Sequence, residues 1–400
     1  MNIIGIVCEY DPFHLGHLYQ LRESRRLLGE DSAVVCVMSG DFVQRGEPAL
    51  WSKYARAEAA CRCGADLVLE LPVQWALSSA EGFARGAVAI LTAAGCSHIS
   101  FGSEEGSVEG MKQLAELLLD EGTIEGIKGL MKLRPQLSFP AARQAYIEEK
   151  HGELGRLLQR PNDILGLEYI KAIIAQNSPM QPITVQRRGS GHDQPGLEGF
   201  ASASQLRSLL AEGRDISPWL PAEVSEILER EGDSGRMVDM ERWELALLSR
   251  LRMLNEDSYL SLPDSEDGTG ARIYSAVRSS VSFEEILAQA KTKRVPQARL
   301  RRMLCQAALG ISSGQNRELP PYARVLAIGC QGRDVLRRSD KDNVIKPLTK
   351  PARVGQISER AERVFACGAY AHDLFCLLYS AKNQRMVGED WRKGPVLVDI

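Results

Sequence analysis

The sequence predicts an α/β protein built on a doubly wound parallel sheet, because strand-like and helix-like patterns alternate through its first hundred residues. Continuously apolar runs at 2–8, 33–38, 66–71 and 98–102 are typical of strands that are buried on both faces. The segments between them place apolar residues at helical spacing and end at glycines. Strands joined by helices in this way lie parallel, with right-handed crossovers.

The length of 400 residues exceeds one compact core, so two or three domains are expected. The first is predicted over residues 1–215, because a strand-like run at 182–188 returns the chain to the sheet. Residues 216–320 have a helical pattern, interrupted by the polar and glycine-rich segment 262–272. Residues 321–400 contain further strand and helix patterns and are expected to form a small α/β unit.

Composition and charge place the chain among globular proteins without identifying a partner. Hydrophobic residues make up 44% and charged residues 25%, which excludes a disordered or fibrous class. The net charge of −3 leaves a nucleic-acid partner open, because a basic surface can be local. The odd number of cysteines, nine, and the lack of an apolar span or signal peptide predict a soluble, cytoplasmic protein. The lone C-x-C pair, Cys61 and Cys63, does not predict a zinc site.

The turn after the first strand, "EYDPFHLGH" at 9–17, carries more chemistry than a turn needs. It lies at the carboxyl end of a parallel strand, where such sheets bind their ligands. His14 and His17 share one face of the first helical turn, and Gly16 between them lets a ligand approach the backbone. The free N–H groups and the helix dipole favour a phosphate, whose transition-state charge the two imidazoles could stabilise.

Two other interpretations of this turn are open. One histidine could cap the helix while the other is an ordinary surface group. A metal site of His14, His17 and Asp11 is also conceivable, although it lacks the glutamate of H-E-x-x-H and a further ligand cluster. The position of the motif at the first strand-to-helix turn favours phosphate handling.

Several blocks of the sequence resemble one known family. Residues 5–17 resemble the N-terminal signature of the HIGH-type nucleotidyltransferase superfamily, which implies a Rossmann-like core. Within that superfamily, the chain is similar to the tRNA(Met) cytidine acetate ligase family, and the likeness extends over essentially its whole length. The further blocks, in the order of the family, lie at 37–50, 65–72, 101–104, 160–169, 185–193 and 348–353.

The resemblance implies a two-step reaction that needs no acetyl-CoA. ATP would adenylylate acetate, giving acetyl-adenylate and pyrophosphate. The exocyclic amine of the wobble cytidine in elongator tRNA(Met) would then take the acetyl group and release AMP. ATP is thus expected as a substrate, with Mg²⁺ on its triphosphate, and acetate and the tRNA as the other partners.

The family's ATP site implies a set of positions in this chain. They comprise the first turn and three later residues: Val7, Cys8, Glu9, Tyr10, Asp11, Pro12, Phe13, His14, Leu15, Gly16, His17, Leu18, Tyr19, Gln20, Gly102, Asn162 and Arg187. Gly102 could instead be a plain turn glycine, and Asn162 could be a helix N-cap.

The expected catalytic residues are His14, His17, Asp41 and Ser103. Asp41 follows the second strand and Ser103 the fourth, so both lie at the sheet edge where ligands bind, and Asp41 could contact substrate or magnesium.

A second segment resembles the superfamily's triphosphate loop, with Ser202, Ser204 and Arg207 at a helix start. Its alternative is an ordinary serine-rich helix cap. The chain departs from the family at Asp11, where asparagine is commoner, and in a shortened 189–193 segment that leaves the role of His192 open.

A tRNA substrate requires a basic surface, and two basic stretches are candidates for phosphate contact. The first contains Lys291, Lys293, Arg294, Arg299, Arg301 and Arg302. The second contains Arg333, Arg337, Arg338, Lys346, Lys350 and Arg353. Each could also be a solvated helix face.

Two rival functions are compatible with part of the pattern. An adenylyltransferase acting on a small phosphorylated metabolite would share the first turn but would not explain the basic stretches. A non-catalytic RNA-binding protein would not explain both histidines. The sequence does not define an oligomeric state.

Overall fold

The computed structural model describes residues 2–398, apart from 105, 188–199, 266–267 and 339–342. Within these residues no helix has the length and apolar character needed to cross a membrane.

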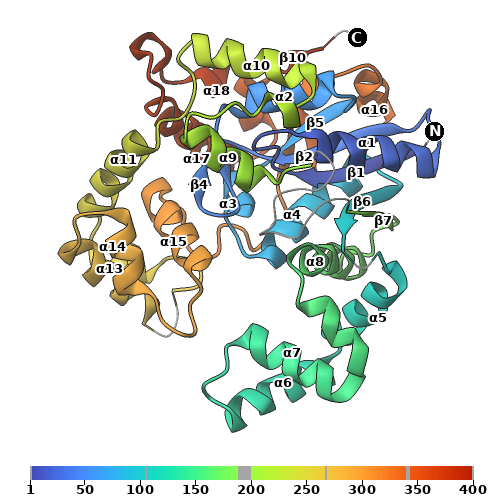
Figure 1. The fold of residues 1–400 in the computed structure, drawn as a ribbon, viewed down its shortest axis with the longest axis vertical. Helices are drawn as coiled ribbons and strands as arrows, with labels where there is room; N and C mark the ends of the chain where they lie inside the picture. Colours follow the sequence, from blue (N-terminus) through green and yellow to red (C-terminus); the bar gives the residue numbers. More distant parts are fainter. Residues whose placement is uncertain (1, 105, 188–199, 266–267, 339–342, 399–400) are drawn as a thin grey trace.

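A mostly parallel sheet runs through the molecule (Figure 1). Its described strands are β1 (Ile3–Cys8), β2 (Ala33–Ser39), β5 (Leu67–Leu71), β6 (His98–Ser103), β7 (Gln181–Gln186), β8 (Tyr322–Ile328), β9 (Lys346–Leu348) and β10 (Val396–Leu397). The order is β10–β8–β5–β2–β1–β6–β7, with β9 paired to β8. In β1, Ile4 aligns with Val34 of β2 on one side and with His98 of β6 on the other. The predicted doubly wound α/β fold is confirmed.

Helices cover both faces of this sheet, which explains why its strands read as continuous apolar runs. Ile3 and Val35 face the layer of α4 (Ala80–Ala93), α5 (Val108–Leu119) and α8 (Pro161–Ala175). Ile4 and Val34 face the opposite layer. That layer consists of α1 (Leu15–Leu28), α2 (Lys53–Arg62), α9 (Ala203–Ala211) and α10 (Ala222–Asp233).

The described part of residues 216–320 is helical. Its first helix, α10, packs on the sheet, so the predicted boundary at 215 is corrected, whereas the later helices have a core of their own. These later helices are α11 (Met240–Met253), α12 (Glu256–Leu260), α13 (Thr269–Ser279), α14 (Phe283–Ala290) and α15 (Gln297–Leu309). This core includes Phe42 of the small hairpin β3 (Phe42–Val43) and β4 (Glu47–Pro48), and Phe375 of α17 (Glu359–Cys376). The helical region therefore packs directly on elements that flank the sheet.

The separate C-terminal unit predicted for residues 321–400 is corrected by the sheet topology. β8 pairs antiparallel with β5, aligning Ala327 with Val68, and β9 and β10 both pair with β8. Val325 and Leu326 lie in the cores on opposite faces of the sheet. The sequence predicted a strand at β8, but it did not predict which edge of the sheet this strand joins. That position depends on pairing with strands that are distant in the sequence.

The other helices are short or project from the body. α3 (Val73–Ala76) follows β5, while α16 (Gly332–Arg338) and α18 (Glu389–Arg392) accompany the C-terminal strands. α6 (Glu121–Leu133) and α7 (Phe139–His151) pack together as a lobe that projects from the sheet domain in Figure 1.

Candidate active site

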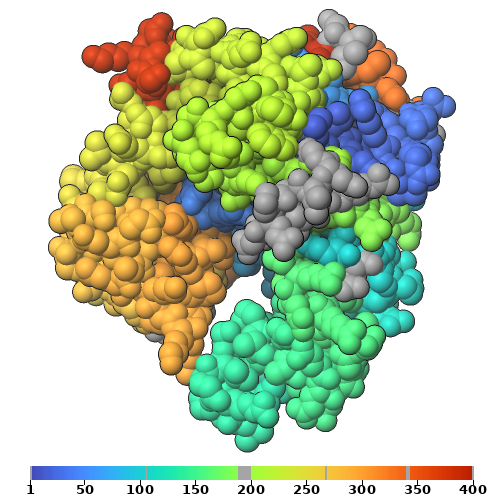
Figure 2. Space-filling view, in the orientation of Figure 1, coloured from blue at the N-terminus to red at the C-terminus, as the bar shows by residue number. Residues whose placement is uncertain are grey.

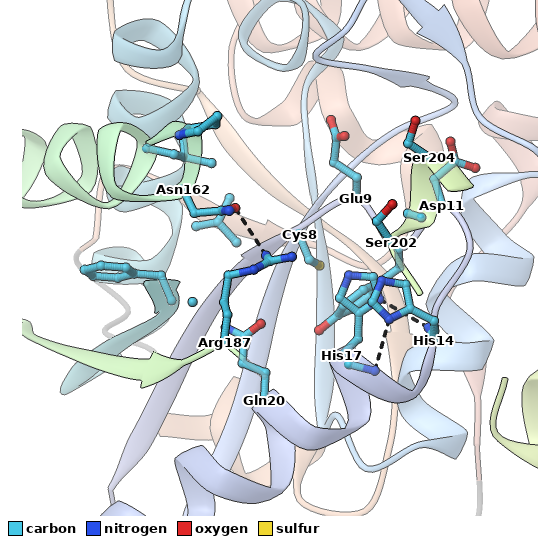
Figure 3. A pocket seen from close by; sticks show the side chains of 18 of the residues that line it. Cys8, Glu9, Asp11, His14, His17, Gln20, Asn162, Arg187, Ser202 and Ser204 are labelled. Atoms are coloured by element: carbon cyan, nitrogen blue, oxygen red, sulfur yellow. Dashed lines mark hydrogen bonds between the residues drawn. The ribbon is translucent and has the colours of Figure 1, made fainter. Parts of the chain in front are cut away.

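A cavity of about 500 Å³ lies at the carboxyl ends of the parallel strands β1, β6 and β7. The first turn and the start of α1 form one wall, and Asn162 and Arg187 lie on the other side (Figure 3). Gly102 of β6 also lines the cavity. The N-terminal ends of α1, α8 and α9 all contribute lining residues. Because each helix end presents unpaired N–H groups and a positive dipole end, the cavity is suited to a multiply charged anion such as a triphosphate.

Most of the expected ATP-site residues line this cavity. They are Val7, Cys8, Glu9, Tyr10, Asp11, His14, Gly16, His17, Tyr19, Gln20, Gly102, Asn162 and Arg187. The triphosphate-loop candidates Ser202, Ser204 and Arg207 line it as well. Pro12, Phe13, Leu15 and Leu18 are not among its lining residues; Phe13 is fully buried and packs on the rings of Tyr10 and His17.

The two histidines are stacked at the start of α1, with ring centroids 3.7 Å apart. His14 is the N-cap residue, and its Nδ1 accepts a hydrogen bond of 3.0 Å from the Gly16 N–H. His17 Nδ1 in turn accepts one of 3.2 Å from the N–H of His14. His14 therefore caps the helix, as one of the alternative interpretations proposed, and it also lines the cavity.

These backbone contacts determine what the imidazoles can offer a ligand. A nitrogen that accepts an N–H carries no proton, so each neutral ring holds its proton on Nε2. Burial, with a smaller effect from Arg187, lowers the pKa of His14 to about 3. Burial and the neighbouring His14 also lower the pKa of His17. The pair therefore presents two neutral Nε2–H donors at neutral pH.

Gly16 is required by the histidine arrangement itself. A Cβ at this position would lie 2.9 Å from Cε1 of His14, closer than side-chain carbons approach one another. The sequence argument assigned Gly16 to close ligand approach, and the structure adds this packing reason within the protein.

Asp11, the departure from the family pattern, connects the first turn to α9. One carboxylate oxygen accepts a 2.7 Å hydrogen bond from the Leu50 N–H, and the other lies 3.4 Å from Nη1 of Arg207. The same Arg207 nitrogen donates to the Asp11 carbonyl at 2.6 Å. The extra negative charge is therefore paired with the basic residue of the second motif.

On the opposite side, Arg187 and Asn162 form a polar chain. Arg187 Nη1 donates to Asn162 Oδ1 at 3.3 Å, and Asn162 Nδ2 donates to Glu104 Oε1 at 2.5 Å. The N-cap of α8 is Arg160, so the N-cap alternative for Asn162 is set aside. A Cβ on Gly102 would lie 3.3 Å from the Arg187 side chain, so a glycine here gives Arg187 room.

Ser103 lies behind the cavity and not in its lining. Its Oγ donates to Asp163 Oδ1 at 2.6 Å and accepts from the N–H of Gly106 at 2.8 Å. Both contacts are buried or half-buried, and they fasten the end of β6 to α8. The geometry thus gives Ser103 a supporting place instead of the catalytic one expected.

Asp41 is likewise placed away from the cavity, in a buried network of ion pairs. Its Oδ2 lies 2.8 Å from His372 Nδ1 and 3.5 Å from Lys53 Nζ. Burial alone would raise the pKa of Asp41, but His372 and Lys53 outweigh it and lower the pKa. With its carboxylate committed in this way, Asp41 is not positioned for the substrate or magnesium contact expected from its sequence position.

The hairpin that begins at Asp41 supplies lining residues that the sequence argument missed. Gln44 and Arg45 lie at its turn and both line the cavity. The Gln44 N–H donates to Glu9 Oε1 at 2.7 Å. Gly46 has a φ of 79° and abuts the backbone of Arg301 in α15. The sequence signal that could have indicated these lining residues was the pair Arg45 and Gly46, in a polar loop after the second strand.

The first basic stretch divides into an exposed part and a half-buried part. Lys291, Lys293 and Arg294 are exposed. Arg299, Arg301 and Arg302 are half-buried in α15, and Arg301 pairs with Glu47 and Glu284 at 2.9 Å each. Arg299 donates to the carbonyl of Asp264. Arg294 donates to the carbonyl of Pro135 but stays exposed, so the exposed trio of Lys291, Lys293 and Arg294 is the better candidate for phosphate contact.

The second basic stretch is exposed but lies in part on the wrong edge of the sheet. β8 runs antiparallel to β5, so α16 begins beside the amino ends of the parallel strands, opposite the cavity. Arg333, Arg337 and Arg338 lie on α16, and Figure 1 shows this helix far from α15. Lys346, Lys350 and Arg353 are also exposed. The shortened 189–193 segment, with His192, lies outside the described residues.

The sheet, the H-x-G-H turn at its carboxyl edge and the three convergent helix ends define a nucleotidyltransferase of the HIGH class. The family model described as HIGH Nucleotidyl Transferase matches residues 1–390. Two relatives named tRNA(Met) cytidine acetate ligase, from Syntrophomonas wolfei and Thermoanaerobacter sp., are 33% and 35% identical. The similarity covers 99% and 98% of both chains respectively. The chain belongs to the tRNA(Met) cytidine acetate ligase family.

Solved structures extend the likeness to three dimensions. Structures of Thermotoga maritima TmcAL, one apo and one bound with alpha-thio ATP, match with TM-scores of 0.93 and 0.92. Each is 31% identical, and the match covers 100% of both chains. The family resemblance predicted from the sequence blocks is confirmed.

Proposed function

We propose that the protein is an ATP-dependent ligase that acetylates the wobble cytidine of elongator tRNA(Met). Acetate would attack the α-phosphate of ATP, forming acetyl-adenylate and releasing pyrophosphate. The cytidine amine would then attack the acetyl carbonyl, forming N-acetylcytidine and releasing AMP. Membership of the family and the similarity to a protein solved with alpha-thio ATP support this reaction.

The paired Nε2–H groups of His14 and His17 carry the chemical part of the proposal. Negative charge builds on the α-phosphate oxygens as the carboxylate attacks and pyrophosphate leaves. Neutral donors already held by backbone hydrogen bonds can stabilise that charge with little reorganisation. Ser202, the N-cap of α9, and Arg207 line the same cavity, and we assign the β- and γ-phosphates to this helix start.

Magnesium on the triphosphate fits the donor set of the cavity. Asp11 is paired with Arg207, which leaves Glu9 as the carboxylate for the ion among the described lining residues, and Mg²⁺ in nucleotide sites is held by one or two carboxylates together with phosphates. The ion would neutralise charge on the leaving pyrophosphate. Burial raises the pKa of Glu9, which an adjacent cation would counteract.

The tRNA is proposed to approach along the face that carries the exposed trio Lys291, Lys293 and Arg294. These residues stand between α14 and α15, and α15 touches the hairpin whose turn lines the cavity. This tip meets the α6–α7 lobe, where Arg294 donates to the carbonyl of Pro135, and Figure 2 shows a hollow beside the meeting point. A cytoplasmic setting belongs to the same proposal, supported by buried free thiols such as Cys8 and Cys36.

One assay tests the proposed function. Purified protein is incubated with ATP, labelled acetate and an elongator tRNA(Met) transcript, and the nucleosides are analysed for acetylcytidine. Product is expected with acetate and ATP, and not with acetyl-CoA alone. A His14→Ala/His17→Ala variant serves as the negative control, and a transcript with uridine at the wobble position tests the acceptor.

The same assay separates the rivals. An adenylyltransferase acting on a phosphorylated metabolite would show no acetate-dependent release of pyrophosphate. A non-catalytic RNA-binding protein would retain the tRNA and consume no ATP. Either result would overturn the proposal.

A further inference from the structure

A second cluster of chemically active side chains lies outside the ATP cavity, where α17 meets α18. His372 is fully buried on α17, and Cys376 lies one helical turn further along the same helix. Glu389 begins α18 and faces both. None of the three lines the ATP cavity, so the reaction proposed above leaves them without a role.

The donor atoms are close enough to share one ion. His372 Nε2 lies 3.0 Å from Glu389 Oε2 and 3.5 Å from Cys376 Sγ, and all the ligand atoms fall within 4.8 Å of one another. In a tetrahedral zinc site, bonds of about 2.0–2.3 Å place neighbouring ligand atoms about 3.3–3.8 Å apart. A small movement of Glu389, the most exposed of the three, would complete this geometry.

The third ligand is held in place by the backbone. Gly388 precedes Glu389 with a φ of 74°, and its N–H donates to Asp373 Oδ1 at 2.7 Å. Asp373 follows His372 directly on α17, so this contact fastens the turn to the helix that carries the other two ligands. Glu389 Oε1 is held by Lys393 Nζ at 2.6 Å, which leaves Oε2 directed at His372.

The other nitrogen of His372 has the partner expected of a metal-binding histidine. His372 Nδ1 lies 2.8 Å from the buried carboxylate of Asp41. A carboxylate behind the imidazole fixes the ring and its tautomer, and leaves Nε2 as the atom that binds the metal. Asp41 also accepts a 2.9 Å hydrogen bond from the Lys53 N–H, so its orientation is itself constrained.

The charge of the surrounding network is compatible with a dication. Lys53 and Arg324 are already paired there with Glu70 and Asp390. Zinc binding would release two protons, one from between His372 and Glu389 and one from the Cys376 thiol. The two positive charges of the ion replace those of the two protons, so the net charge of the cluster is unchanged. His, Cys and Glu side chains are the donors that zinc prefers, whereas magnesium and calcium prefer oxygen alone.

We propose that His372, Cys376 and Glu389 bind a zinc-class divalent metal ion, with a fourth position open to water. The ion would fasten α17 to α18 and, through Asp41, to the base of the hairpin that carries Gln44 and Arg45 into the ATP cavity. The alternative is an imidazolium at His372 that bridges Asp41 and Glu389 with no metal.

Metal content tests the site independently of activity. The full-length protein is loaded with Zn²⁺, freed of excess by gel filtration and analysed by mass spectrometry for the metal. About one zinc per chain is expected for the wild type, and at least a tenfold lower content for Cys376→Ser and Glu389→Gln. Cys367→Ser is the matched control, because Cys367 lies on the same helix outside the cluster and should leave the content unchanged.

Cobalt provides a second measurement that reports the ligand itself. Co²⁺ added to the metal-free wild type should give a thiolate-to-cobalt charge-transfer band, which Cys376→Ser should abolish and Cys367→Ser should keep. Circular dichroism establishes that the variants are folded, and Glu389→Gln provides an independent result should Cys376→Ser not fold. Less than a tenth of an equivalent of zinc in the wild type, or a full equivalent in Cys376→Ser, would overturn the site and favour the imidazolium.

Discussion

Backbone hydrogen bonds to the Nδ1 atoms make His14 and His17 donors through Nε2, and burial keeps both rings neutral. The neutral imidazoles therefore stabilise phosphate charge as preorganised hydrogen-bond donors. The same arrangement favours glycine at one position in this motif, since the His14 ring occupies the space of a Cβ on Gly16.

Replacing either histidine should therefore impair the chemical step selectively. His14→Ala and His17→Ala are each expected to slow acetate-dependent adenylate formation about a hundredfold, because one preorganised donor to the transition-state charge is lost. Pyrophosphate release measures this step, and filter binding measures tRNA affinity, which should stay nearly unchanged. His151→Ala, on the exposed end of α7, is the matched control. A parallel loss of tRNA affinity would show that the histidines are structural.

The lowered pKa of His14 also predicts a pH dependence of stability. The folded pKa of about 3 lies below the ordinary value of 6.5, so the unfolded chain binds the proton first as the pH falls. Because of His14, the free energy of unfolding should therefore fall by about 2 kcal/mol when the pH is lowered from 7.5 to 5.

Urea unfolding at the two pH values measures this effect. The wild type should lose about 2 kcal/mol more than His14→Gln, in which the side-chain oxygen can still accept from Gly16. Equal losses in both proteins would contradict a neutral, buried His14. The window lies above the titration range of ordinary carboxylates, which limits their contribution.

Among the elements, the first turn and α9 are coupled by Asp11 and Arg207. Asp11→Asn should keep the hydrogen bond from Leu50 and lose only the partly exposed ion pair, so stability should fall by less than about 1 kcal/mol. ATP affinity should be retained or increase, because Arg207 becomes available to the triphosphate. Asp11→Ala should lose about 1–3 kcal/mol, since the Leu50 N–H is left without its acceptor.

Thermal or urea unfolding and calorimetric titration with ATP distinguish these outcomes. If Asp11→Asn weakened ATP binding as strongly as Arg207→Ala, the carboxylate itself would have to contribute to the site, for example through magnesium.

The parallel strands β1, β2, β5 and β6 and the helices α1, α2 and α4 were predictable, because each strand is buried on both faces and a glycine follows each of these helices. The short helix α3 and the hairpin of β3 and β4 were not predicted. The place of the H-x-G-H turn followed from the strand before it. Asp41 and Ser103 were misplaced by the same reasoning: both follow strands at the correct edge, but their side chains turn inward to His372 and Asp163. Sequence position gives the edge of the sheet, whereas the direction of a side chain depends on partners that are distant in sequence.

For the whole molecule, the decisive contacts join segments that no local pattern connects. Arg324 on β8 pairs with Glu70 on β5 and with Asp390 on α18, and Lys53 bridges the same two acids. All four side chains are buried, so removal of one partner would leave charges uncompensated. This network explains why the C-terminal segment is part of the sheet domain, and why the sequence could suggest its strands but not its place.

The arrangement of the whole molecule also separates the two basic stretches, and this separation predicts how tRNA binding depends on salt. Replacing Lys291, Lys293 and Arg294 with alanine should weaken tRNA(Met) binding and lower the slope of log affinity against log salt by about one per lost phosphate contact. The exposed arginines Arg333, Arg337 and Arg338 provide a control of equal charge change, because α16 lies at the sheet edge opposite the cavity. Their triple alanine variant should leave the slope unchanged. Filter binding across a salt series measures both variants, and an equal effect of the two would mean that the tRNA is attracted by overall charge and not by the surface beside the cavity.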